Sequence, residues 1–290
     1  MNPAEFGQIA VNAILLSGIL ALVALGFSLV WGIMNIVNLA HGAYVVLGAY
    51  LTFYLHDLAG VDPFVSIPIS MIVLFGIGFV VQRVLINQVV RAPLLATFLL
   101  TFGLEILIVN LVNYFFKADL RSVTTPYSGT GFNFGPVRIP YIRLGALGIS
   151  MVLVLATAWF LKSTRYGRAI RATGMDIDAA RLTGVKVGTI YALTYAIGAS
   201  LAGAAGSLLS VIVPFDPNLG GGYTERAFVI SVLGGLGALG NVVLGATLYA
   251  FVDVFVGARA PELSQAVTFA VLVIVLVLRP QGIAGKKTYA

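Results

Sequence analysis

The run IAVNAILLSGILALVALGFSLVW (residues 9–31) decides the fold class of this chain. None of its side chains is charged. An α-helix rises 1.5 Å per residue, so a run of this length crosses the roughly 30 Å hydrocarbon core of a bilayer. No basic residue precedes it in the sequence MNPAEFGQ. We therefore expect a transmembrane helix that stays in the membrane and is not removed as a signal peptide.

The composition extends this conclusion to the whole chain. Of its 290 residues, 59% are hydrophobic and only 10% are charged, and the mean hydropathy is +1.01. A soluble domain carries about 25% charged residues to cover its surface. We therefore predict an all-α, polytopic membrane bundle that forms a single domain over residues 1–290.

The apolar runs predict about eight or nine transmembrane segments, one of them broken or re-entrant. The run at 226–257 is too long for one simple crossing, and GGLGALGN (234–241) interrupts it. Three interpretations stay open: two short crossings, a re-entrant hairpin beside an interface or pathway, or a plain turn at the cytoplasmic side. The expected spans are 9–31, 43–57, 64–86, 93–116, 143–162, 188–213, 226–257 and 264–279.

The basic residues predict the orientation of these spans. Most of the 17 basic residues lie at Arg83 and Arg91, within 162–187, or within 279–287. Because cytoplasmic loops are enriched in Lys and Arg, we expect the N-terminus outside and the C-terminus in the cytoplasm. The net charge of +6 is therefore interpreted as a basic cytoplasmic face and not as a nucleic-acid site.

The longest external loop is expected at 117–142. Its stretch FNFGPVRI alternates apolar and polar residues around a Gly-Pro pair, which is typical of a short β-hairpin. A disordered cap and a surface for an external partner are the alternatives.

No motif for chemistry on a bound substrate is present. The chain has no cysteine and two histidines, and it lacks the phosphate-binding pattern GxxxxGK[ST] and the zinc motif HExxH. We expect no metal site, no cofactor and no enzymatic activity of its own. Transport of a solute would then use a gradient, passive conduction or a separate ATPase.

Four polar residues within or beside the apolar runs are pathway candidates: Asn35, Asn38, His41 and Glu105. Asn35 and Asn38 would share a helical face, or they cap a broken helix beside a cavity. His41 either gates a pathway or caps a helix end. Since an acidic side chain is expensive within the bilayer, Glu105 should face the bundle interior.

Glu105 has two interpretations. One is a place in the pathway, and the other is a structural hydrogen bond to Thr101 or Asn110. Asp253 lies nearer the end of its span. A single acidic residue in the middle of a span is weak evidence for proton coupling, because proton-coupled carriers usually place several ionisable groups inside the membrane.

The loop at about 163–187 is charged and helix-forming. Asp176 and Asp178 precede the short segment AARLTG, where they would complement the dipole of a helix N-terminus. Gly184 would allow the chain to turn out of that helix. A helix of this kind fits a groove on a partner protein, although a solvated cytoplasmic loop would carry the same charges.

The pattern AAxxxG at 179–184, with Asp178 before it and GRAIRA (167–172) upstream, resembles the coupling helix of bacterial ABC-importer permeases. That resemblance implies contact with an ATPase subunit. The implied coupling residues are Arg171, Asp176, Asp178, Ala179, Ala180, Leu182 and Gly184.

Four further stretches resemble one family within that class, the branched-chain amino-acid permeases of the LivH/LivM type. They lie in the family's order along nearly the whole chain. They are NLAHG (38–42), RAPLLATFLLTFGLEILIVN (91–110), GGGYTERAFVISVLGGLGALGNVVLGA (220–246) and VLRPQGIAG (277–285).

The resemblance implies a multi-pass subunit of a heteromeric importer in the bacterial inner membrane. Its partners would be a second related permease, one or two cytoplasmic ATPases and an external substrate-binding protein. Leucine, isoleucine and valine are the expected substrates, with other amino acids, urea or short amides as alternatives. A gradient-driven carrier or channel, or a structural membrane scaffold, would be an alternative from another class.

The stretch IGASLAGAAGSLLS (197–210) places Ala199, Gly203 and Ser207 at every fourth position. A row of small residues lets helices approach closely. We expect packing within this subunit, with a pathway or a permease–permease interface as the alternative.

Overall fold

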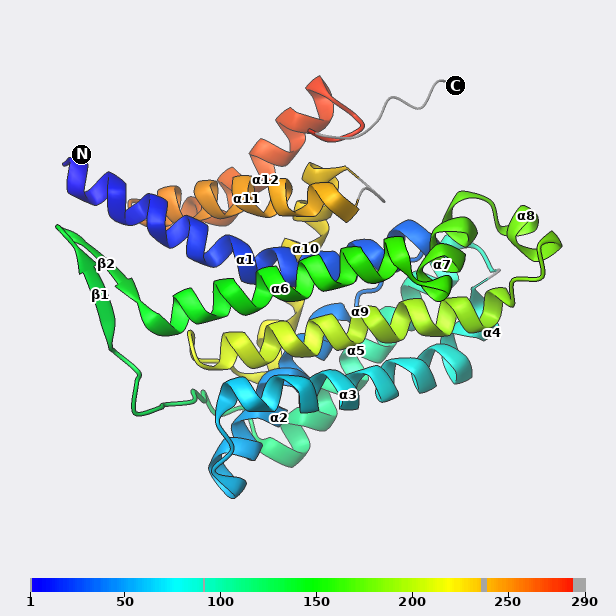
Figure 1. The fold of residues 1–290 in the computed structure, drawn as a ribbon, viewed down its shortest axis with the longest axis horizontal. Coiled ribbons are helices and arrows are strands. Elements are labelled where there is room, and N and C mark those ends of the chain that lie inside the picture. Colours follow the sequence, from blue (N-terminus) through cyan, green and yellow to red (C-terminus); the bar gives the residue numbers. More distant parts are fainter. Residues whose placement is uncertain (1, 91, 236–238, 284–290) are drawn as a thin grey trace.

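The computed structural model describes residues 2–90, 92–235 and 239–283, and these residues form a bundle of helices with one small hairpin (Figure 1). The first half contains α1 (Pro3–Met34), α2 (His41–Ala59), α3 (Pro63–Val81), a π-helical turn (Gln82–Ile86), α4 (Asn87–Val89) and α5 (Leu94–Phe116). The second half contains α6 (Tyr141–Ser163), α7 (Arg165–Met175), α8 (Ile177–Leu182), α9 (Val187–Ser210), α10 (Gly220–Gly234), α11 (Val242–Gly257) and α12 (Pro261–Leu278), with 3-10 turns at Pro217–Leu219 and Leu239–Asn241.

Six helices of the described chain are long and apolar enough to cross a membrane. They are Pro3–Met34, Pro63–Val89, Leu94–Phe116, Tyr141–Ser163, Val187–Ser210 and Pro261–Leu278. Shorter helices complete the bundle, so the predicted all-α polytopic class is confirmed.

Two of these helices form the centre of the bundle. In α1 and α9, 89% of the most apolar window is buried, whereas the other four spans bury 28% or less. The small residues of α9 explain its central place, because Gly203 lies against Leu74 of α3 and a side chain at Gly206 would collide with the carbonyl of Val45 on α2. The predicted small-residue face therefore serves packing within this subunit.

The hairpin predicted in the loop at 117–142 is confirmed. Strand β1 (Gly131–Phe134) pairs antiparallel with β2 (Val137–Pro140). The hairpin is fixed to the start of α1, because the side chain of Gln8 bonds the backbone N–H of Arg138 at 2.8 Å and its carbonyl at 3.0 Å. These contacts place the start of α1 and the start of α6 at the same end of the bundle, which we call the hairpin end (Figure 1).

A hydrogen bond from a tyrosine to a carboxylate joins the external loop to the start of α3. Tyr127 donates its hydroxyl to Asp62 at 2.7 Å, and Asp62 also caps α3 by accepting from the N–H of Phe64 at 2.8 Å. Burial, aided by the hydrogen bond to Asp62, raises the pKa of the Tyr127 phenol to about 12. The phenol therefore stays a hydrogen-bond donor at neutral pH.

Helices α10 and α11 are the two halves of the run at 226–257, for which the sequence left three interpretations open. Their 15 and 16 residues span only roughly 24 Å, which is less than the bilayer core. α10 follows the end of α9, where the carbonyl of Ser210 accepts from Val123 at the hairpin end. Near the end of α11, Val254 shares a cavity with Asn12 of α1 and Arg143 of α6, which lie at that same end.

The pair thus begins and ends near the hairpin end, while the end of α10 lies beside the residues that follow α12, where the N–H of Ile283 donates to the carbonyl of Leu233 at 2.9 Å. The re-entrant hairpin, the two short crossings and the turn at the cytoplasmic side all stay predictions. The helix stops at Gly235, whose φ of 98° is a conformation that favours glycine. The centre of the predicted break, residues 236–238, lies outside the described residues.

The ends of the bundle separate the charges as predicted. Arg83 and the stretch 162–186 lie at the end opposite the hairpin. Arg91, Lys286 and Lys287, which also supported the predicted orientation, lie outside the described residues.

Candidate translocation site and coupling helix

The chain unwinds inside the bundle between α1 and α2. Residues 35–40, which we call the unwound segment, contain no helix, and Asn35 ends α1 with a left-handed φ of 53°. α2 then begins at His41 opposite Val23, which lies in the middle of α1. The unwound segment therefore returns from the end of α1 to the middle of the bundle, and its polar backbone needs partners there.

Two threonines from other helices supply those partners. On α5, Thr101 donates to the carbonyl of Val37 at 3.1 Å and accepts from the N–H of Leu39 at 3.3 Å. On α10, Thr224 donates to the carbonyl of Leu39 at 3.0 Å and accepts from the N–H of Gly42 at 2.8 Å. The hydroxyls replace the hydrogen bonds that a continuous helix would have made.

Asn38 points inward to a pair of tyrosines. Tyr195 of α9 donates to its side-chain oxygen at 3.1 Å, and the hydroxyl of Tyr44 lies 3.2 Å from that of Tyr195. Since the proton of Tyr195 is used on Asn38, Tyr44 is the donor of the second bond. Neither Asn35 nor Asn38 lies within a helix, so they share no helical face. Asn35 is the C-cap of α1, as the alternative interpretation of a capped, broken helix predicted.

His41 is fully buried at the start of α2. Its Nε2 lies 2.9 Å from the carbonyl of Val23, so this nitrogen carries the proton, and the ring packs edge-on against Phe27. The residue before it, Ala40, is the N-cap and has no side-chain cap bond. The interpretation of His41 as a helix cap is therefore wrong, because its ring binds α1 and not the end of its own helix.

Two helix N-termini meet beside the unwound segment. α2 begins at His41 and α10 at Gly220, and a side chain at Gly42 would collide with the carbonyl oxygen of Gly220. Only glycine permits this approach. The N-termini of helices carry a partial positive charge, so this part of the bundle favours an anionic group.

Glu105 lies one turn beyond Thr101 on α5, next to α10. Its nearest carboxylate oxygen is 3.5 Å from the position that a side chain on Gly221 would take, and Glu225 is close enough to interact with it electrostatically. The expected structural hydrogen bond is wrong, since Thr101 binds the unwound segment and Asn110 donates to the carbonyl of Ile106. Glu105 is half-buried, so it faces the surface of this subunit.

The charged loop folds into two short helices at the end opposite the hairpin. Thr164 caps α7 by accepting from the N–H of Gly167, and Asp176 caps α8 by accepting from the N–H groups of Asp178 and Ala179, both at 2.9 Å. The chain leaves α8 through Gly184, whose φ is 84°. The predicted short helix with acidic residues at its start is confirmed.

The coupling candidates divide into an anchored and an exposed group. Arg171 donates from Nε to the carbonyl of Leu161 at 3.0 Å, which fixes α7 to the end of α6. Ala180 is buried, whereas Asp178, Ala179 and Leu182 are exposed. Leu182 is 90% exposed, although its side chain is wholly apolar. Met175, at the end of α7, is 88% exposed as well, so two large apolar side chains of the α7–α8 element lie at its surface.

Comparison with known proteins identifies the family. The model of the family described as "Branched-chain amino acid transport system / permease component" matches residues 9–276. This chain belongs to that permease family. BraD of Pseudomonas aeruginosa is a permease protein of a high-affinity branched-chain amino acid transport system. It is 30% identical over an alignment of 295 positions, which covers 96% of this chain and 95% of BraD.

Other relatives of this permease are more distant. LivH of Salmonella typhimurium, named as a permease of the same kind of system, is 28% identical over 97% of this chain and 96% of its own length. LsrC of Yersinia pseudotuberculosis, named as a permease of an autoinducer 2 import system, is 34% identical over 46% of this chain and 36% of its own length. No solved structure matches the permease significantly.

Sequence reasoning missed several polar residues of this permease. Thr101 was considered only as a partner for Glu105, and Thr224, Tyr195 and Glu225 were not singled out as site residues. The only sequence feature that indicates such residues is a polar side chain within an apolar run. This feature predicts that the side chain has a polar contact but does not predict its partner. The contacts join residues as far apart as 185 positions, so only the folded chain reveals them.

Proposed function

We propose that this permease is the membrane subunit of an ATP-driven importer for branched-chain amino acids. The α7–α8 element carries the proposal, because it is fixed to α6 and presents an exposed apolar tip between two long helices. The printed names of BraD and LivH support the substrate class. Other amino acids, urea, short amides or a signal molecule of the LsrC kind are the alternatives.

The distribution of charge supports the orientation. The basic stretch with Arg83 and residues 162–186 lies at one end, which the positive-inside tendency places in the cytoplasm. The hairpin and the start of α1 are then outside, where an external substrate-binding protein docks. α8 then faces the cytoplasm, where a separate ATPase docks, and closure of the ATPase pair moves α7 and α8 as a lever on α6 and α9.

A second permease covers the face formed by α5, α10 and α12. Glu105 is half-buried there and Glu225 is exposed, with Gln265 of α12 donating to Glu225 at 2.8 Å. Carboxylates at membrane depth face protein or water and not lipid, because their transfer into hydrocarbon is costly. The substrate path then follows this face, past the N-termini of α2 and α10.

The amino-acid substrate matches the chemistry of that face. Its carboxylate is complementary to the two helix N-termini, and its ammonium is complementary to Glu105 and Glu225. Its aliphatic side chain would lie against the aromatic group of Trp31 and Phe228, which stack at 5.3 Å.

The test uses the complete transporter purified from the host and reconstituted in liposomes. We expect uptake of labelled leucine that requires ATP, and loss of the ATPase from the purified complex when Leu182→Asp is introduced. The control is Leu120→Asp, which alters a leucine that is 68% exposed in the external loop. Retention of the ATPase by both variants would contradict the role of α8, and uptake by the permease alone without ATP would indicate a carrier or channel.

A further inference from the structure

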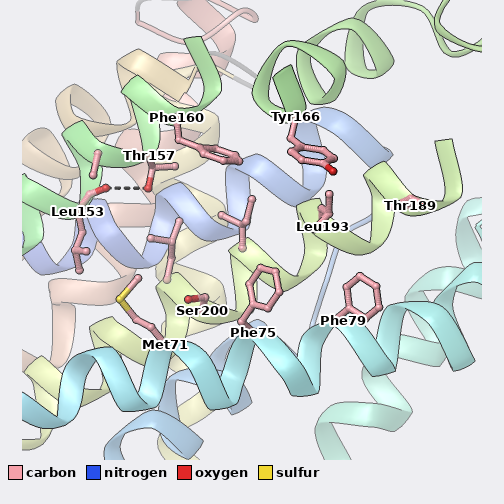
Figure 2. A pocket seen from close by; sticks show the side chains of 13 residues that line it. Met71, Phe75, Phe79, Leu153, Thr157, Phe160, Tyr166, Thr189, Leu193 and Ser200 are labelled. Carbon is pink, nitrogen blue, oxygen red and sulfur yellow. Dashed lines mark hydrogen bonds between the residues drawn. The ribbon is translucent and has the colours of Figure 1, made fainter. Parts of the chain in front are cut away.

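A long apolar groove lies on the face of the bundle opposite α5. It has a volume of about 700 Å³, and its walls are α3 on one side and α6 with the start of α7 on the other. Met71, Phe75 and Phe79 line the first wall, and Leu153 and Phe160 line the second. Their side chains point toward one another across the groove, while α9 forms its floor (Figure 2). In Figure 1 this side faces the viewer and α5 lies behind it.

The groove exists because its two walls pack on different partners. α3 packs along α9, whereas α6 packs mainly on α1, so a gap opens between α3 and α6. The outer surfaces of both walls are exposed and apolar, as at Ile72 of α3 and Val152 and Trp159 of α6. Such surfaces are typical of helices that face lipid.

One end of the groove is basic. Tyr166 and Thr189 line the groove where it reaches α7, and Lys162 and Arg165 are exposed beside them. Across the groove, Arg83 is exposed one turn beyond Phe79. The segments 63–90, 141–175 and 187–210, which build the groove, contain no Asp or Glu. An apolar groove that ends in cations and a tyrosine hydroxyl matches an amphipathic anion with a long hydrocarbon chain.

We propose that this groove binds an anionic phospholipid of the cytoplasmic leaflet. One acyl chain lies between α3 and α6 along α9, and the phosphate lies among Arg83, Lys162 and Arg165 near the hydroxyl of Tyr166. The intramembrane carboxylates Glu105 and Glu225 lie on the other face, so the second permease belongs there and the groove stays open to lipid. Since α6 and α9 flank α7 and α8, the bound lipid touches both helices that move with the coupling element.

The experiment uses the complete transporter in nanodiscs with photoreactive phosphatidylglycerol. We expect the photoreactive lipid to label peptides that contain residues 71–79 and 153–166. Labelling by a photoreactive neutral phosphatidylcholine should be weaker, by about fivefold for each cation that contributes to binding. Ala156 is exposed and lines the groove, whereas Ala158 is exposed two positions further along α6 and does not line it. Ala156→Trp should therefore remove the label, and Ala158→Trp should preserve it.

Substitutions of the cations test the headgroup separately. Arg83→Gln with Arg165→Gln should abolish the preference for the anionic lipid, whereas Lys117→Gln at the hairpin end should leave it unchanged. Equal labelling by both lipids would overturn the proposed headgroup site. Cross-links from position 156 to the second permease, or label that persists in Ala156→Trp, would overturn the groove as a lipid site.

Discussion

The unwound segment and the α7–α8 element contrast in how their polar groups are satisfied. The unwound segment receives hydrogen bonds from α5, α9 and α10, which are distant in sequence. The α7–α8 element takes its caps from neighbouring residues and leaves Leu182 exposed. The first region is therefore part of the architecture of this subunit, whereas the second is capped by its own residues and has the exposed tip that the proposed contact with an ATPase requires.

This contrast predicts separate consequences of substitution. A change at the unwound segment should reduce stability, and transport should fall with it. A change in α7–α8 should leave the bundle intact and uncouple transport from ATP.

The largest effect is expected for Gly42→Ala. The added methyl group would collide with the carbonyl oxygen of Gly220, and backbone at a helix N-terminus cannot move as a side chain can. Overpacking typically lowers the free energy of unfolding by about 1–3 kcal/mol. A collision with rigid backbone should lower it by at least as much. We expect little folded protein, measured as the monodisperse yield in detergent and the melting temperature.

The control for Gly42→Ala is Gly222→Ala on α10. A side chain at Gly222 would meet no atom within 4 Å. This variant should fold with wild-type yield. If the two variants behaved alike, the close contact between the starts of α2 and α10 would not exist in the folded protein.

Removing the hydroxyl of Thr224 should have the next largest effect. Thr224→Val leaves the carbonyl of Leu39 and the N–H of Gly42 without their partner, and each unsatisfied buried group costs about 1–3 kcal/mol. Thr247→Val is the matched control, because that hydroxyl binds only Val243 of its own helix. The melting temperature in detergent should fall clearly for the first variant and little for the second, and equal falls would argue against the bridging role.

The smallest effect on stability, with a large effect on transport, is expected for Gly184→Val. The left-handed backbone at position 184 costs a residue with a side chain about 1–2 kcal/mol. This cost affects the turn after α8 and not the packing of the bundle, because an added Cβ would meet no neighbouring atom within 4 Å. We expect an unchanged melting temperature and a five- to thirtyfold loss of ATP-driven leucine uptake, roughly the equilibrium equivalent of that energy.

Gly184→Asn distinguishes conformation from contact, because asparagine tolerates the left-handed region. It should retain most of the uptake. Wild-type uptake by Gly184→Val would show that the geometry of α8 does not matter for coupling.

Local patterns predicted much of this fold. The apolar runs located the spans to within a few residues, as 188–213 compares with Val187–Ser210, and the charged stretch predicted α8 with its acidic start. Both features depend on neighbouring residues, namely the length of an apolar run and a cap three positions away. The local pattern was less informative about 226–257, because a short re-entrant pair and two crossings have the same composition.

The candidate site was predicted less completely. Asn38 was named without its partner Tyr195, which is 157 positions away, and one of the two interpretations of Glu105 was a hydrogen bond that Asn110 makes instead to Ile106. In a helix that is apolar on all sides, the pattern does not indicate which face meets which neighbour.

The sequence by itself determined that this protein is a helical membrane permease, where its basic end lies and where the short helix α8 begins. Hydrophobicity, charge and capping act over a few residues, so they can be read along the chain. Only the tertiary structure decided which polar side chains support the unwound segment, which carboxylates reach the surface and where a groove stays open. Those outcomes depend on which helices pack together, and that is settled by close contacts between residues far apart in sequence.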